Sequence, residues 1–172
     1  MRPMTTLPVR ALVIEDYADA RELYVIVLEL AGFDVESAGT GPEGLALARQ
    51  RPPAVVVLDL GLPGQSGLDV ARELRRMATT ADAVILMVSG HAGPGYQTLA
   101  EDAGCDAALA KPCTPEELVL VVSELLEAKG QSTSSWAVTN HWPGSSDPDL
   151  IRDPRDPESN FERLPAAEAS RA

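Results

Sequence analysis

The sequence is poor in aromatic residues, in basic residues and in cysteine, and the last two shortages each exclude a class of protein. Aromatic side chains make up 4% of the 172 residues, and 14 Lys and Arg face 26 Asp and Glu, which gives a formal net charge of -12. This acidic surplus argues against binding to nucleic acid by neutralisation of phosphates, so we expect no direct nucleic-acid partner. The two cysteines, Cys105 and Cys113, suit neither a disulfide framework nor a zinc site.

Long hydrophobic runs are also missing. No apolar stretch approaches the roughly 20 residues that a membrane span needs, and residues 1–10 do not have the pattern of a secretory signal. We therefore expect a cytoplasmic protein without a membrane partner. The hydrophobic content of 45% is still sufficient for a core, and the length suits one domain with an appendage.

The composition changes near residue 130. Residues 9–129 alternate short apolar runs with amphipathic stretches, whereas residues 130–172 contain five prolines and show no helix or strand period. This division predicts a domain over 9–129 and a proline-rich, disordered C-terminal tail over 130–172. Both tryptophans, Trp136 and Trp142, lie in the tail, which leaves a short docking segment as the alternative.

Five short strand-like runs occur in the first part, and they cover residues 11–14, 34–37, 54–58, 84–88 and 107–110. Three of them are apolar throughout, which indicates strands that are buried on both faces of a parallel sheet. Helical patterns alternate with the strands, and Thr40–Glu43 and Thr114–Glu117 have the pattern of capping boxes. The predicted fold is α/β, with five βα units wound into one parallel sheet that carries helices on both faces.

Polar residues follow four of the predicted strands. Glu15 and Asp16 follow the first strand, Asp59 the third, Ser89 the fourth and Lys111 the fifth. The carboxyl ends of parallel strands form the ligand-binding edge of such a sheet, so these side chains should converge. Three clustered carboxylates repel one another unless a cation intervenes, and Mg²⁺ suits a site of few oxygen ligands that also takes a phosphate.

A carboxylate beside such a metal can attack phosphorus to form an acyl phosphate, while a lysine and a serine hold the phosphoryl oxygens. Each residue alone also has an ordinary interpretation. Asp16 could be a helix N-cap, Asp59 and Ser89 could belong to turns, and Lys111 could be a solvated charge. The agreement of four strand ends in chain order favours a phosphoryl-accepting site.

These motifs resemble the receiver domain of two-component response regulators, the CheY-like family. The resemblance covers about residues 9–129 and rests on Val9–Asp16, Val55–Gly67, Val84–Gly90 and Gly104–Pro112. It implies a flavodoxin-like sandwich with strand order 2-1-3-4-5, the order of this family. It also implies phosphorylation of Asp59, with Glu15, Asp16 and the backbone carbonyl of Gly61 as further ligands of Mg²⁺.

The resemblance implies roles for the other motif residues as well. Ser89 would be the switch hydroxyl, Lys111 would bind the phosphoryl group, and the Lys111–Pro112 bond would be cis, which proline permits. The family usually has an aromatic residue at the position of Ala108, and an alanine cannot swing as a ring does. We therefore expect a response to phosphorylation in the loop from Ser89 to Tyr96, with Tyr96 as the nearest movable ring.

The resemblance implies a signalling function by protein contact. The phosphoryl donor would be a sensor histidine kinase or a histidine phosphotransfer protein, and the downstream protein is not indicated. The tail is too short and too rich in proline for a DNA-binding output domain, and only self-catalysed aspartyl phosphorylation and dephosphorylation are expected. The alternatives are a degenerate receiver that acts without phosphorylation, or the receiver portion of a hybrid kinase. An FMN or nucleotide binder is disfavoured, because Glu15 and Asp16 would repel an anion and no glycine-rich loop follows the first strand.

Overall fold

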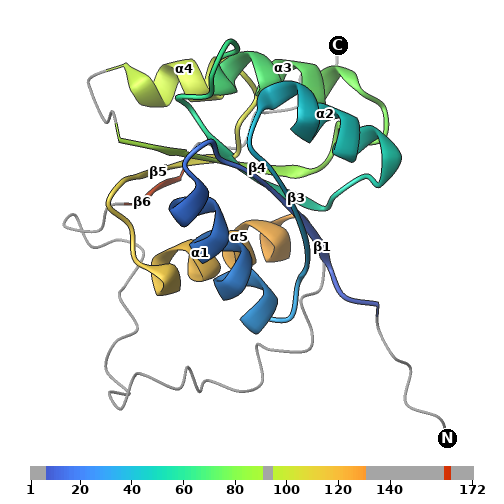
Figure 1. Ribbon diagram of the computed structural model, residues 1–172. Coiled ribbons are helices and arrows are strands. Elements are labelled where there is room, and N and C mark those ends of the chain that lie inside the picture. The colour runs from blue at the N-terminus through green and yellow to red at the C-terminus, as the bar shows by residue number, and fades with distance from the viewer. Residues whose placement is uncertain (1–6, 91–94, 131–160, 164–172) are drawn as a thin grey trace, which may run out of the picture.

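The computed structural model describes residues 7–90, 95–130 and 161–163. A single sheet lies between two layers of helices (Figure 1). The strands are β1 (Arg10–Ile14), β2 (Asp34–Ala38), β3 (Val55–Asp59), β4 (Val84–Ser89), β5 (Ala107–Ala110) and β6 (Phe161–Arg163). The helices are α1 (Ala18–Leu30), α2 (Gly41–Gln50), α3 (Gly67–Arg76), α4 (Tyr96–Asp102) and α5 (Pro115–Ala128).

The first five strands are parallel and stand in the order β2-β1-β3-β4-β5, as the resemblance implied. Each observed strand begins and ends within one residue of its predicted bounds. All residues of β3 and β4 are buried, which explains why their sequences are apolar on both faces. The doubly wound α/β fold is therefore confirmed.

The sheet separates two hydrophobic clusters. Ala11 and Val13 of β1 join the cluster beneath α1 and α5, while Leu12 and Ile14 join the cluster beneath α2, α3 and α4. This alternation follows from the period of two along a strand, which sends successive side chains to opposite faces. Both faces of β1 are thereby covered by helices (Figure 1). Glu15 and Asp16 follow directly at its carboxyl end.

The observed N-termini of α1 and α2 differ from two predicted details. The capping box predicted at Thr114 is complete, but at Thr40 the carboxylate of Glu43 accepts from the backbone N–H of Gly39 instead of from that of Thr40. The N-cap of α1 is Tyr17, which makes no capping bond with its side chain, so Asp16 is not the N-cap. Asp16 therefore remains an exposed carboxylate beside the polar edge of the sheet.

The prediction of no strand beyond residue 130 is wrong at residues 161–163. These residues form β6, which pairs antiparallel with β5 at the edge of the sheet. A run of three residues is too short to show a period, so no sequence pattern indicates this strand. Trp136, Trp142 and the rest of residues 131–160 and 164–172 lie outside the described residues.

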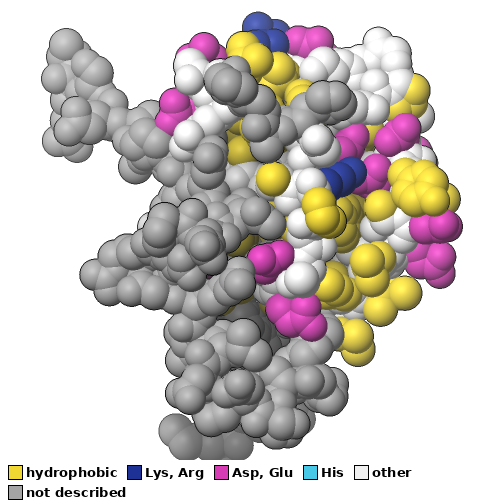
Figure 2. All heavy atoms as spheres, turned by 90° about the vertical axis from the view of Figure 1, so that its left-hand side faces the viewer, with side chains coloured by type: hydrophobic (Ala, Val, Ile, Leu, Met, Phe, Trp, Pro, Cys, Tyr) yellow, Lys and Arg dark blue, Asp and Glu magenta, His cyan; other side chains and the backbone are white. Residues whose placement is uncertain are grey.

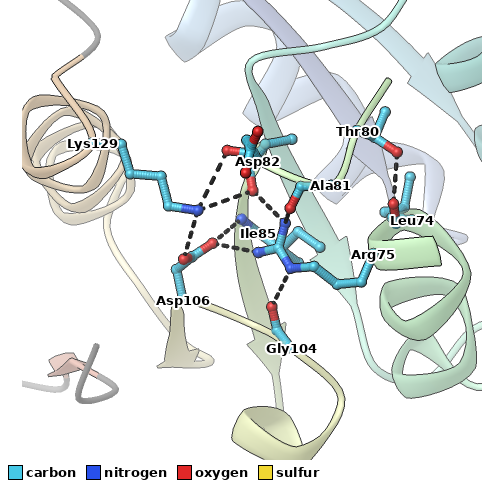
Figure 3. A network of polar contacts seen from close by, with 10 residues as sticks. Leu74, Arg75, Thr80, Ala81, Asp82, Ile85, Gly104, Asp106 and Lys129 are labelled. Atoms are coloured by element: carbon cyan, nitrogen blue, oxygen red, sulfur yellow. Dashed lines mark hydrogen bonds and ion pairs between the residues drawn. The ribbon is translucent and has the colours of Figure 1, made fainter. Parts of the chain in front are cut away.

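An ion-pair network connects α3, the starts of β4 and β5 and the end of α5 (Figure 3). It lies at the opposite end of the strands from Glu15 and Asp59. The guanidinium of Arg75 donates to the carbonyls of Ala81, Ala83 and Gly104 and to the carboxylate of Asp106. Asp106 also accepts from Lys129 at 2.9 Å, which joins the end of α5 to the start of β5.

Among the described helices, none is long and apolar enough to cross a membrane.

Candidate phosphoryl-accepting site

Three carboxylates meet at the carboxyl ends of β1 and β3. Glu15 directly follows β1, and Asp59 is the last residue of β3, so the parallel pairing of these strands brings both to one edge. Glu15 is 2% exposed and Asp59 is 8% exposed, whereas Asp16 faces solvent. One carboxylate oxygen from each of the three lies within 4.8 Å of the others. The acids singled out in the sequence therefore do converge.

Lys111 joins two of these acids. Its ammonium Nζ lies 2.7 Å from Oε2 of Glu15 and 2.8 Å from Oδ1 of Asp59. Burial alone would lower the pKa of Lys111, but the hydrogen bonds and charges of Asp59 and Glu15 outweigh burial and raise the pKa. The interpretation of Lys111 as a solvated charge is therefore wrong. The peptide bond from Lys111 to Pro112 is cis, as the resemblance implied.

The second oxygen of Asp59 is held by the backbone. Oδ2 accepts from the N–H of Gly61 at 2.7 Å, so each oxygen of this carboxylate has one donor. The loop that follows is closed by a bond from the N–H of Gly67 to the carbonyl of Leu60. A Cβ on Gly67 would stand 2.2 Å from the backbone oxygen of Asp59, so only glycine fits this approach.

The cluster fits a divalent metal ion by its chemistry. The carboxylates of Glu15, Asp16 and Asp59 carry three negative charges, and the ammonium of Lys111 compensates one. Carboxylate oxygens are the ligands that Mg²⁺ prefers, and Asp16 is exposed, which leaves the cluster open to an ion from solvent. These three residues could therefore hold Mg²⁺. The carbonyl of Gly61 stays an expected ligand.

Ser89 is the buried last residue of β4, and a buried tyrosine lies close to it. Burial raises the pKa of Tyr96, and the nearby Ser89 hydroxyl partly offsets this rise, although the two hydroxyls do not meet in a hydrogen bond of good geometry. Within the described part of the chain, the Tyr96 hydroxyl is buried without a hydrogen-bond partner. Tyr96 also belongs to the same hydrophobic cluster as Ala108.

Two residues that support the site, Arg21 and Gly67, could not be identified from the sequence. Arg21 donates to the backbone carbonyl of Glu15 at 2.7 Å and to that of Asp16 at 3.3 Å, so it holds the loop that carries both acids. Gly67 permits the close approach of its own backbone to Asp59. The only sequence signal for Gly67 was its place after Ser66, an N-cap residue type, and nothing distinguished Arg21 from a surface arginine of α1.

Comparisons with known proteins agree with this geometry. The chain matches the family model of the response regulator receiver domain over residues 11–123. It is 32% identical to the phosphate regulon transcriptional regulatory protein PhoB of Pseudomonas aeruginosa over 72% of this chain and 54% of that protein. It is 39% identical to the DNA-binding dual master transcriptional regulator RpaA of Synechocystis over 68% of this chain and 48% of that protein.

Solved structures give the same result. A CheY-like receiver domain protein of Methanospirillum hungatei superposes with a TM-score of 0.68 at 26% identity, over 72% of this chain and 98% of that one. The chemotaxis response regulator CheY4 of Vibrio cholerae superposes with a TM-score of 0.66 at 26% identity, over 69% and 99%. The chain spans about half the length of the curated relatives it matches. This chain belongs to the response regulator receiver domain family.

Proposed function

We propose that this protein is a phosphoacceptor in which Asp59 takes a phosphoryl group from a phosphohistidine. The observation that carries the proposal is that both carboxylate oxygens of Asp59 accept hydrogen bonds, Oδ1 from Lys111 and Oδ2 from the N–H of Gly61. These two bonds fix the orientation of the carboxylate beside two further acids. A positioned carboxylate at a metal-binding cluster is suited to in-line attack on phosphorus.

The proposed step transfers one phosphoryl group. An oxygen of Asp59 forms a bond to phosphorus while the P–N bond of the phosphohistidine breaks, and its electron pair returns to the imidazole nitrogen. Lys111 stays near the reacting carboxylate and offers its ammonium to a phosphoryl oxygen. Mg²⁺ bound by Glu15, Asp16 and Asp59 would neutralise charge on the phosphoryl oxygens. Ser89 is the hydroxyl donor proposed for the phosphorylated state.

The proposed partners follow from this step. A sensor histidine kinase or a histidine phosphotransfer protein supplies the phosphoryl group in the cytoplasm, and the receiver then signals by contact with another protein. The relatives named above are transcriptional regulators, one of them named as DNA-binding, and this chain matches only about half of each. Its net charge of -12 supports signalling by protein contact instead of by DNA binding.

Phosphorylation of the purified chain tests the proposal. With Mg²⁺ and a small acyl-phosphate donor, the wild type should gain one phosphoryl group by mass spectrometry, and Asp59→Asn should gain none. Asp69→Asn is the matched control, because Asp69 is an exposed carboxylate on α3, and it should be labelled like the wild type. Equal labelling of Asp59→Asn would refute the acceptor assignment. An unlabelled wild type would favour a receiver that acts without phosphorylation.

A further inference from the structure

The outer edge of β5 carries backbone N–H and carbonyl groups that cannot form hydrogen bonds to β4, because β4 lies on the other side of the strand. On one side β5 pairs with β4, and the N–H of Lys111, the residue after β5, donates to the carbonyl of Ser89 at 2.8 Å. Backbone groups of successive residues in a strand point to opposite sides. Since the N–H of Lys111 points to β4, and Ser89 stands opposite Ala110 in the parallel register, the backbone groups of Leu109 and Ala107 also point to β4, whereas those of Ala108 point to the outer edge.

The strand β6 lies at this outer edge (Figure 1). The antiparallel register sets Leu109 opposite Phe161, Ala108 opposite Glu162 and Ala107 opposite Arg163. Opposed residues in an antiparallel pair alternate between those that exchange two hydrogen bonds and those that exchange none. Because Ala108 points outward, its pair with Glu162 is the bonded one. The N–H groups of Phe161 and Arg163 therefore point away from β5.

We propose that the outer edge of β5 is a docking surface for an extended strand, and that its resident occupant is residues 161–163 of the same chain. An open edge strand is a template for pairing with other chains, and covering it is a common protection. Here the cover comes from a segment far along the chain. A partner that adds a strand to β5 would have to displace it first.

The chain length supports an occupant from the same molecule. Residues 131–160 connect the end of α5 to β6, and a chain of that length can extend over roughly 100 Å, more than the width of a domain of this size. A tether of this kind raises the local concentration of the segment to about the millimolar range. A pairing of three residues would hardly form between separate molecules at lower concentrations, but a tether makes it accessible.

Proline substitutions in the full chain give a sharp test, because proline removes a backbone donor. Glu162→Pro removes an N–H that points to β5, whereas Phe161→Pro and Arg163→Pro each remove one that points away. The readout is hydrogen exchange at the amide of Ala108. In the wild type, Phe161→Pro and Arg163→Pro, this amide should exchange at least about tenfold more slowly than in Glu162→Pro.

Two internal checks complete the experiment. The amides of Ala107 and Leu109 point to β4, so they should stay protected in all four proteins. Protection of Ala108 should not change when the protein is diluted. Equal exchange in all four proteins would overturn the docking, and loss of protection in Phe161→Pro and Arg163→Pro but not in Glu162→Pro would overturn the register. Protection that disappears on dilution would show that the strand comes from a second copy.

Discussion

The ammonium of Lys111 lies 2.8 Å from Oδ1 of Asp59, so the residue after β5 is bonded to the last residue of β3 across the intervening strand. The same ammonium is 2.7 Å from Glu15, which follows β1. Three separate parts of the sheet thus meet at one cation. A change of charge on Asp59 must therefore affect the position of Lys111, and through it the end of β5.

The raised pKa of Lys111 predicts a stability difference at alkaline pH. A group whose pKa is raised by folding stabilises the fold fully below its unfolded pKa, about 10.4, and this contribution is lost as the pH rises through the higher folded value. The free energy of unfolding of the wild type should therefore fall more steeply above about pH 10 than that of Lys111→Met. Urea unfolding between neutral pH and about pH 11.5 measures the difference.

The tyrosines do not confound this comparison. Burial also raises the pKa of Tyr24 and of Tyr96, and their ionisation destabilises the fold at high pH. Both tyrosines are present in both proteins, so their contribution cancels in the difference. Parallel curves for the wild type and Lys111→Met would contradict the ion pairs seen at this site.

The acidic pair should be needed for metal binding. The double variant Glu15→Gln and Asp16→Asn keeps the shape of both side chains but removes two of the three negative charges of the cluster. Removing a residue that merely hydrogen-bonds to a metal ligand already weakens metal binding by roughly tenfold or more. Removing the charges of two ligands should therefore weaken Mg²⁺ binding at least as much. Titration calorimetry measures the binding.

Phosphorylation of this double variant should be lost together with the metal. Asp19→Asn is the control, because Asp19 is exposed in the first turn of α1, and it should bind Mg²⁺ normally. Phosphorylation of the wild type that persists in EDTA would show that the carboxylates act without a metal ion.

A methyl group at Gly67 should disturb the acceptor loop. The Cβ would stand 2.2 Å from the carbonyl oxygen of Asp59 and 2.9 Å from Cα of Leu60, and neither backbone atom can yield as a flexible side chain does. Gly67→Ala should lower the free energy of unfolding by about 3 kcal/mol, the upper part of the range for overpacking. Gly90→Ala, where a Cβ meets nothing within 4 Å, should change it little. Equal urea midpoints for the two variants would contradict the close approach.

The response to a phosphate mimic should centre on the residues around Ser89. Ala108 has no ring to move, while Tyr96 is buried in the same cluster and its hydroxyl has no hydrogen-bond partner among the described residues. A charge-assisted bond from Ser89 to the phosphoryl group is worth about 1.5–3 kcal/mol, enough to bias this region. Amide shifts should therefore be large at Asp59–Gly67, Ser89 and Tyr96 and small at Ala108. The loop residues 91–94 lie outside the described residues.

Two variants separate the contributions to this response. Ser89→Ala should abolish the shift at Tyr96 while Asp59 remains phosphorylatable. Tyr96→Phe should leave stability unchanged or raise it by about 1 kcal/mol, because it removes a buried hydroxyl without a partner. A shift at Tyr96 that persists without the Ser89 hydroxyl, or a rearrangement centred on Ala108, would contradict this account.

The amino-acid sequence by itself determined the fold class and the candidate acids. The buried strands are apolar throughout, so their type and their bounds could be read within one residue. Glu15, Asp59, Ser89 and Lys111 could be assigned to one edge because parallel strands place their carboxyl ends together. These are consequences of period and polarity along the chain, which local sequence records.

Only the tertiary structure decided which atoms meet. The hold of Lys111 on two acids, the support of Arg21 beneath their loop and the close approach of Gly67 all depend on distances between elements far apart in the chain. The place of Phe161–Arg163 beside β5 is the clearest case, because three residues carry no period of their own. Their conformation comes from the unpaired backbone groups of the strand that they join, and no local pattern records that partner.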